Sequence, residues 1–185
     1  KAYFMTVAGI ANNALAACLN TAFTATLTAP AFSMPAFDDS AAPFPAGLVM
    51  DRSGKVTGTP AAPGVTNVSV LVTDQVTGFM CRQAVVMTVR GITNLPLPQA
   101  QVDIPYSQQL TTSGFVVASF SIQSGSLPAG LSLSAAGLIS GTPTTAQTTT
   151  AVVLMNDLAT GAQCAQGVTI TAAVGQFKFN INWSN

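Results

Sequence analysis

The feature that most constrains this chain is an internal repeat with a constant offset of 83 residues. Residues 44–60 (FPAGLVMDRSGKVTGTP) align with residues 127–143 (LPAGLSLSAAGLISGTP) without a gap, and 8 of the 17 positions are identical. The same offset continues upstream, where residues 20–27 align with residues 103–110. A fixed period of this length decides the architecture before any local pattern does, so the chain is expected to be a tandem array of one module.

The repeat divides the 185 residues into four segments. These are an N-terminal strand at 1–8, a first module at 9–91, a second module at 92–174 and a C-terminal strand at 175–185. The first segment is included because residues 5–10 (MTVAGI) match residues 87–92 (MTVRGI) at the end of the first module. The chain is thus expected to open with a strand like the last strand of a preceding module.

Each module has the pattern of short β-strands separated by turns. Polar and apolar residues alternate in 131–134 and 168–171, β-branched residues are frequent, and no helical stripe is present. About seven strands per module, with turn signals every 8–12 residues, predict an all-β fold of antiparallel sandwiches. The side chains expected in the cores are Leu48, Val56, Leu131, Leu133 and Ile139.

The motif at 127–144 (LPAGLSLSAAGLISGTPT), followed by a strand ending in Asp157, resembles the putative-Ig repeat of bacterial surface proteins and the related dystroglycan-type cadherin-like domains. The resemblance implies two tandem Ig-like (cadherin-like) sandwiches that act as spacers, adhesive units or assembly units. It also implies a bacterial, extracellular or cell-surface location. Cadherin-like relatives bind calcium through clustered acids, but the linker at 92–103 offers only Asp103, so no metal or cofactor is expected.

The composition argues against several classes of function. Only 6% of the residues are charged, the net charge is +0 and histidine is absent, which disfavours a nucleic-acid surface and histidine-based catalysis. The longest aliphatic stretch, 151–155, is far shorter than the ~20 residues of a membrane-spanning helix. We therefore expect a non-enzymatic protein that neither binds nucleic acid nor inserts into a membrane.

The two ends of the chain are predicted to be assembly strands. The sequence alternates strictly near the C-terminus, with large apolar side chains on one face and polar ones on the other. The assembly residues are Phe177, Phe179, Ile181 and Trp183 at this end, and Tyr3, Met5 and Val7 at the other. A strand of this kind can add to the sheet of a neighbouring subunit. Two alternatives remain: the strands pair within their own chain, or the chain is a segment of a longer repeat protein.

The three cysteines suggest an oxidising compartment. First and last strands of an Ig-like sandwich can run side by side, so a Cys18–Cys81 disulfide is predicted. Cys164, the repeat equivalent of Cys81, has no counterpart of Cys18 in its own module and is expected to be free, bonded between subunits or bonded to Cys18. Leu15-Ala-Ala-Cys18 also has the form of a lipoprotein cleavage box, a less favoured interpretation because residues 5–10 match a strand.

These observations predict a structural subunit of a pilus-like filament or other surface assembly, with copies of itself as partners. The alternative is an adhesin or spacer module that binds a glycan or a host or surface protein through loops such as 33–45. In that loop Asp38 and Asp39 are expected at a solvated tip, and Phe32, Phe37 and Phe44 either pack in the core or form a glycan platform.

Overall fold

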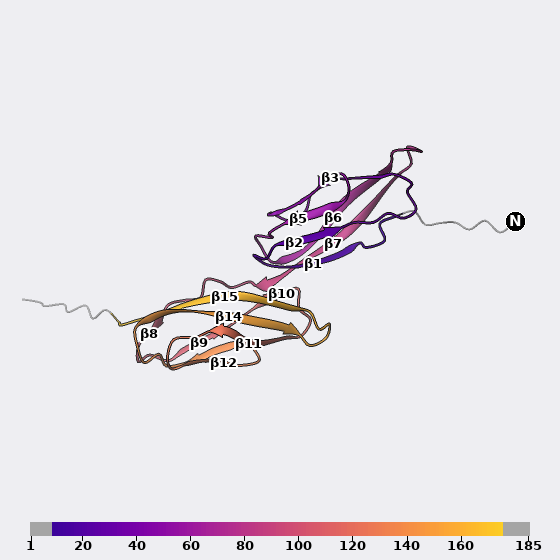
Figure 1. Cartoon of the computed structure of the whole chain (residues 1–185). Coiled ribbons are helices and arrows are strands. Elements are labelled where there is room, and N and C mark those ends of the chain that lie inside the picture. Colours follow the sequence, from indigo (N-terminus) through magenta and orange to yellow (C-terminus); the bar gives the residue numbers. More distant parts are fainter. Residues whose placement is uncertain (1–8, 176–185) are drawn as a thin grey trace, which may run out of the picture. The chain divides into compact units, whose positions relative to one another are not determined.

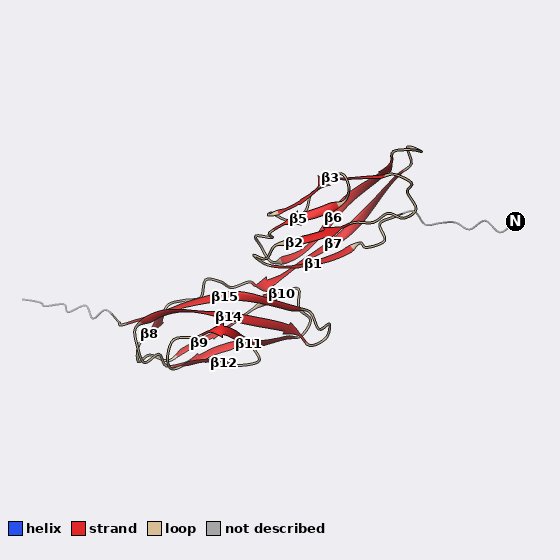
Figure 2. Cartoon of the chain, in the orientation of Figure 1, coloured by secondary structure: helices blue, strands red, loops and turns tan. Residues whose placement is uncertain are grey.

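Residues 9–175 are described by a computed structural model, and within them the chain forms fifteen strands and no helix (Figure 2). These residues divide into two compact units. The first comprises 9–93 with Thr112–Val116, and the second comprises Asn94–Thr111 with 117–175. The predicted all-β class with tandem sandwiches is confirmed.

The first unit is a sandwich of two sheets (Figure 1). Its strands are β1 (Ala14–Cys18), β2 (Phe23–Thr26), β3 (Pro35–Ala42), β4 (Leu48–Met50), β5 (Lys55–Gly58), β6 (Gly64–Asp74), β7 (Met80–Ile92) and β10 (Thr112–Ser113). The larger sheet has the order β1-β7-β6-β3, with β10 also on β7, and the smaller has the order β2-β5-β4. All pairings are antiparallel except β1 with β7, which is parallel.

The second unit repeats this arrangement, except that β10 has no counterpart in it. Its strands are β8 (Ala100–Gln101), β9 (Tyr106–Gln109), β11 (Ala118–Gly125), β12 (Leu131–Leu133), β13 (Leu138–Gly141), β14 (Gln147–Asp157) and β15 (Gln163–Ala173). The sheet orders are β11-β14-β15-β8 and β12-β13-β9. The offset of 83 carries β3, β4 and β6 onto β11, β12 and β14 with identical bounds.

The core of each unit follows the period-two alternation of its central strands. On β6, Val68, Val70 and Val72 are at most 1% exposed, while the residues between them are half-buried. On β14, the counterpart Val153 is completely buried. Burying one such valine contributes about 1.5–3 kcal/mol, which is why β-branched alternation fixes the face of these strands.

Three of the five predicted core residues are buried, and two are not. Leu48, Val56 and Ile139 lie in the cores, whereas Leu131 and Leu133 are only half-buried. These two lie on β12, which is an edge strand of the smaller sheet in the second unit. Alternation indicates which face a side chain occupies, but it does not indicate whether a neighbouring strand covers that face.

The glycines of the repeated motif bring two backbones together. Gly141 has a φ of +136°, and a Cβ at this position would overlap the carbonyl oxygen of Gly130. A Cβ on Gly130, which has a φ of +92°, would in turn overlap the carbonyl oxygen of Thr142. The pair Gly47 and Gly58 has the same geometry in the first unit. Glycine is required at both positions because no side chain fits between the turn and the strand.

Candidate functional site

A groove of about 710 Å³ lies along β3 at the edge of the first unit. Its walls come from β3, from the turn between β4 and β5, and from the outer face of β6. The lining residues are Met34, Pro35, Ala36, Phe37, Asp38, Asp39, Ser40, Met50, Asp51, Arg52, Ser53, Leu71, Thr73 and Gln75. The groove therefore includes part of the segment that the sequence analysis named as a ligand-binding loop.

The carboxylates of this groove are held by short-range hydrogen bonds. Asp38 accepts hydrogen bonds from the backbone N–H (2.9 Å) and the hydroxyl (3.1 Å) of Ser40. Asp51 accepts them from the hydroxyl (2.6 Å) and N–H (2.8 Å) of Ser53 and from the N–H of Lys55 (3.1 Å). These bonds hold the pKa of each carboxyl below its ordinary value of 3.8, so both are charged at neutral pH.

The expectation that Asp38 and Asp39 form a loop tip is wrong. Both lie on β3, which pairs with β6 and has an irregular register between Asp38 and Ala42. The proline-rich composition of this segment favoured a loop, yet prolines and charged residues are also typical of protected edge strands. The acids thus belong to a sheet edge, and within residues 9–175 no group of three or more His, Cys, Asp and Glu side chains is placed to hold a metal ion.

The aromatic residues of the same segment are packed inside the first unit. Phe32, Phe37 and Phe44 are all buried, which confirms the expectation of core packing and leaves none of them as an exposed glycan platform. Phe32 also contacts Phe79, with ring centroids 5.8 Å apart at a tilted angle of 43°. Aromatic pairs at this separation stabilise the packing of the turn against the core.

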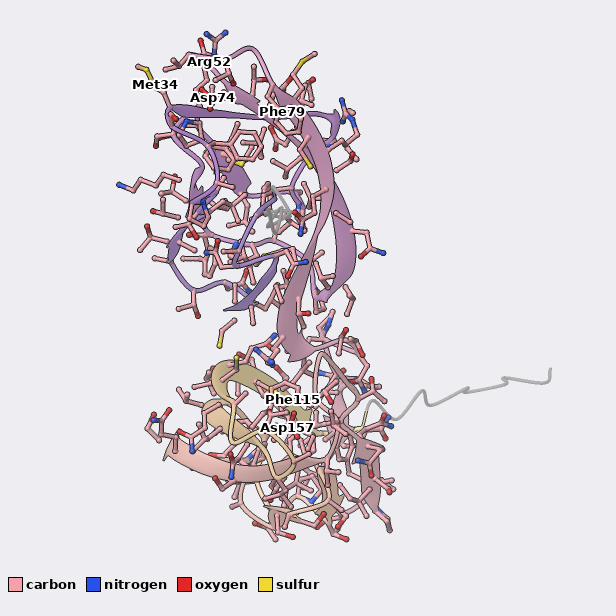
Figure 3. The ribbon with its side chains drawn as sticks, turned by 90° about the vertical axis from the view of Figure 1, so that its right-hand side faces the viewer. Met34, Arg52, Asp74, Phe79, Phe115 and Asp157 are labelled. Atoms are coloured by element: carbon pink, nitrogen blue, oxygen red, sulfur yellow. The ribbon has the colours of Figure 1, made fainter. Side chains whose placement is uncertain are left out.

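Each unit has a buried aspartate that holds one end of the sandwich together (Figure 3). In the first unit, Asp74 at the end of β6 accepts hydrogen bonds from the N–H groups of Ser33 (2.9 Å), Val76 (2.9 Å) and Thr77 (3.4 Å). The bond from Ser33 is the largest of the causes that lower the pKa of Asp74. The carboxylate therefore ties the segment before β3 to the turn between β6 and β7.

Asp157 performs the same task in the second unit, where it is completely buried at the end of β14. It accepts hydrogen bonds from the N–H groups of Val117 (3.1 Å) and Ala159 (3.1 Å) and from the hydroxyl of Thr160 (2.8 Å). The acidic residue that ends the motif in the sequence is thus a structural anchor. Both of its carboxylate oxygens accept hydrogen bonds within the second unit.

The end of the first unit that contains Asp74 is unusually apolar. Met34, Val76, Phe79 and Met80 are 55–68% exposed, and Figure 3 shows Met34, Asp74 and Phe79 at this same end. An exposed group of large apolar side chains is typical of a surface that contacts another protein. These residues have no common signal in the sequence, because they lie in two separate segments, at Met34 and at 76–80.

The disulfide prediction requires correction. Cys18 and Cys164 are both disulfide-bonded, whereas Cys81 is a half-buried thiol. The predicted Cys18–Cys81 bond is therefore wrong, and of the three alternatives for Cys164 the free thiol is excluded. The strands β1 and β7 do lie side by side, but their parallel register places Cys18 opposite Arg90. Arg90 is nine residues along β7 from Cys81 (90 − 81), about 30 Å at 3.3 Å per residue, and a disulfide needs Cα atoms within about 7 Å.

The two equivalent edge strands, β3 and β11, differ in how they are protected. At the offset of 83, Pro35 is replaced by Ala118, Asp38 by Ser121 and Asp39 by Ile122. Proline and charged side chains discourage other chains from pairing with an edge strand, and β11 has neither. A comparison of the two repeats position by position would have shown this difference in the sequence.

The predicted assembly residues lie outside the described part of the chain. They are Tyr3, Met5, Val7, Phe177, Phe179, Ile181 and Trp183, in segments 1–8 and 176–185. Their role remains a prediction from the sequence. Residues 14–18, which contain the possible lipoprotein box, form β1, and Leu15 and Ala17 on this strand are buried.

Comparison with protein families identifies the modules. A family model with the description "Putative Ig domain" matches the chain twice, over residues 6–90 and 88–173. The chain belongs to this Ig-domain family. The two matches confirm the resemblance inferred from the repeated motif, and together they cover nearly all of the chain. No curated protein sequence matches it.

Several solved structures resemble this Ig-domain protein at low identity. A "putative alpha-galactosidase" from Bacteroides fragilis has 22% identity over 46% of this chain and 17% of its own, with a TM-score of 0.39. Cadherin domains 3–6 of protocadherin gamma B2 have 11% identity over 90% of this chain and 50% of theirs (TM-score 0.36). Domains EC1–3 of Drosophila N-cadherin have 13% identity over 87% and 63% (TM-score 0.36). The chain thus spans a minor part of the galactosidase and half of the protocadherin.

Proposed function

We propose that this chain is a non-enzymatic structural subunit of an extracellular assembly on a bacterial surface, and that subunits join into a pilus-like filament by exchange of a terminal strand. One observation carries the proposal. The second unit already contains β15, the counterpart of β7, as the last strand of its sandwich. The alternating segment at 177–183 is therefore additional to the strands that the sandwich uses.

Burial of the apolar face of that segment supplies the driving force. Phe177, Phe179, Ile181 and Trp183 alternate with polar residues, so a strand conformation places all four side chains on one face. Burying four large apolar side chains contributes on the order of 6–12 kcal/mol before the entropy of ordering the strand is subtracted. Insertion into the sheet of a neighbouring subunit would gain this free energy along with backbone hydrogen bonds.

The state of the cysteines also supports an assembly outside the cytosol. Disulfide-bonded cysteines persist in oxidising environments outside the cytosol, and Cys18 and Cys164 are both in this state. Ig-like repeats are usual components of extracellular proteins. Across residues 9–175, no helix is long and apolar enough to span a membrane.

The test is to delete residues 176–185 and to image the protein by negative-stain electron microscopy after size-exclusion chromatography. We expect folded monomers from the deletion variant and filaments from the full chain. A matched pair of variants separates the two faces of the strand. Phe179→Ser with Ile181→Ser should abolish polymer, whereas Lys178→Ser with Asn180→Ser should preserve it. Unchanged filaments after the deletion would eliminate this strand as the connector.

A second candidate function is binding of a glycan or protein through the groove along β3. The observation that favours it is the combination of three carboxylates and Arg52 in one open groove, since planar charged groups orient polar ligands. Screening of the full chain on a glycan array tests this function. Binding that is lost in Arg52→Ala and Asp38→Ala variants would support it, and the absence of any bound glycan or protein would count against it.

A further inference from the structure

The outer edge of β11 is a sheet edge of the second unit that carries neither proline nor a charged side chain. Strand β11 has eight residues, and it pairs on one side only, with β14. Its counterpart β3 has Asp38 and Asp39 where β11 has Ser121 and Ile122. An uncharged edge of this length is a template for pairing with another strand.

The backbone of β11 presents hydrogen-bonding groups on its outer side. The N–H of Phe120 points away from β14, because it donates to the carbonyl oxygen of Ala135 at 3.0 Å. Outward and inward groups alternate along an antiparallel strand, so the N–H and C=O of Ile122 also point outward. Among the described residues no strand pairs with this side of β11. The turn between β12 and β13 thus already occupies the edge at Phe120, and the edge that is open to an additional strand begins at Ile122.

The side chains along this edge leave an apolar rim. Phe120 and Ile122 lie opposite Met155 and Val153 on β14, both completely buried, so all four share the core face of the sheet. Ile122 is nevertheless 41% exposed. The rim continues across the sandwich to β12, whose leucines are half-buried. Ile122 is thus an apolar side chain on the core face that no neighbouring strand of the sheet covers.

Building on the proposed function, we infer that the outer edge of β11 is the acceptor site for residues 177–183 of a second copy. The period-two patterns match, because β11 presents the sequence Ser119-Phe-Ser-Ile122 and the segment presents Phe177-Lys-Phe-Asn-Ile181-Asn-Trp183. Apolar residues of the added strand would cover Ile122, and its polar residues would lie beside the serines.

The test uses the full chain and its own fluorescence. Trp183 is the only tryptophan, so its emission reports on the segment alone. In a dilution series, we expect the emission of the unmodified chain to move to shorter wavelength as concentration rises. The double variant Ser121→Asp, Ile122→Asp should shift the midpoint to at least about tenfold higher concentration, since a buried carboxylate opposes strand addition.

The matched controls separate the edge from general effects of charge and folding. Aspartates already occupy the equivalent positions of β3, so the double variant keeps residues that this fold accepts. Thr145→Asp with Ala146→Asp adds the same charge to an exposed loop of the same unit and should behave like the unmodified chain. Ile122→Pro removes the outward N–H together with the isoleucine side chain, and it should also weaken assembly. Circular dichroism checks that each variant is folded.

The outcomes distinguish this inference from the proposed function. If the β11 variants assemble normally while deletion of 176–185 prevents assembly, strand exchange stands and β11 is not the acceptor. If the deletion variant assembles like the full chain, residues 176–185 are not the donor strand, and both the proposed strand exchange and this inference are wrong. A short-wavelength emission that is independent of concentration would show docking within one chain and would overturn the role of a second copy.

Discussion

The repeated glycine pair provides a quantitative test of how the motif builds each sandwich. In Gly141→Ala, the new side chain would have to tolerate a φ of +136°, at a cost of about 1–3 kcal/mol. It would also overlap the carbonyl oxygen of Gly130, and relief of that overlap by shifting β12 against β13 costs about 1–3 kcal/mol more. The expected loss is therefore about 2–6 kcal/mol in the free energy of unfolding.

Gly161→Ala is the matched control in the same unit. Gly161 has a φ of +72°, but a Cβ there meets no atom within 4 Å, so only backbone strain of about 1–2 kcal/mol is expected. Urea denaturation of both variants, followed by circular dichroism under non-reducing conditions, measures the difference. At about 4–8 °C per kcal/mol, Gly141→Ala should also lower the melting temperature clearly more than Gly161→Ala. Equal losses in the two variants would refute the argument that backbone contact requires glycine.

Two further predictions concern the cysteines and the pH dependence of stability. Alkylation of the unreduced, unfolded protein should modify Cys81 alone, and Cys18 and Cys164 should react only after reduction; a disulfide-linked peptide pair containing Cys81 would contradict this assignment. Because hydrogen bonds lower the pKa of folded Asp74 below 3.8, its stabilising contribution is present above that pH and is lost as pH falls through the lowered value. Asp74→Asn should therefore flatten the decrease in unfolding free energy below pH 3.8, and an unchanged pH profile would exclude this carboxylate as its source.

The fold could be predicted from the sequence because two independent patterns agree. The offset of 83 residues gives the number of modules, and alternation such as that of Val68, Val70 and Val72 gives the buried face of a strand. The glycines of the motif add the positions of tight backbone contact. These patterns can be interpreted from the sequence without knowledge of which strands are neighbours in a sheet.

The errors arose where the answer depended on pairing between strands. The Cys18–Cys81 prediction assumed adjacent strands without their direction, and a parallel register separates the two residues along β7. Leu131 and Leu133 on the edge strand β12 are half-buried, whereas Leu48 on the equivalent edge strand β4 is buried, and no local pattern reveals this difference. Asp38 and Asp39 looked like a loop because proline-rich composition is shared by loops and protected edges.

The exposed rim of β11 was missed for the same reason. Ile122 belongs to an alternating segment, and only the sheet order shows that no described strand covers it. The difference between Asp38-Asp39 and Ser121-Ile122 was visible in the aligned repeats, but it acquires meaning once both pairs are known to lie on equivalent edges. Comparison of repeats is therefore most informative after the strands have been placed.

A structure of the assembled full chain, obtained by electron cryo-microscopy, tests the central claim most directly. The account predicts an added strand along β11 from Ile122 onward, continuous with Gly175 of a neighbouring copy and with Trp183 on its core face. Density that leads from 177–183 back to the same copy, or a β11 edge with no strand beside it, would contradict the account.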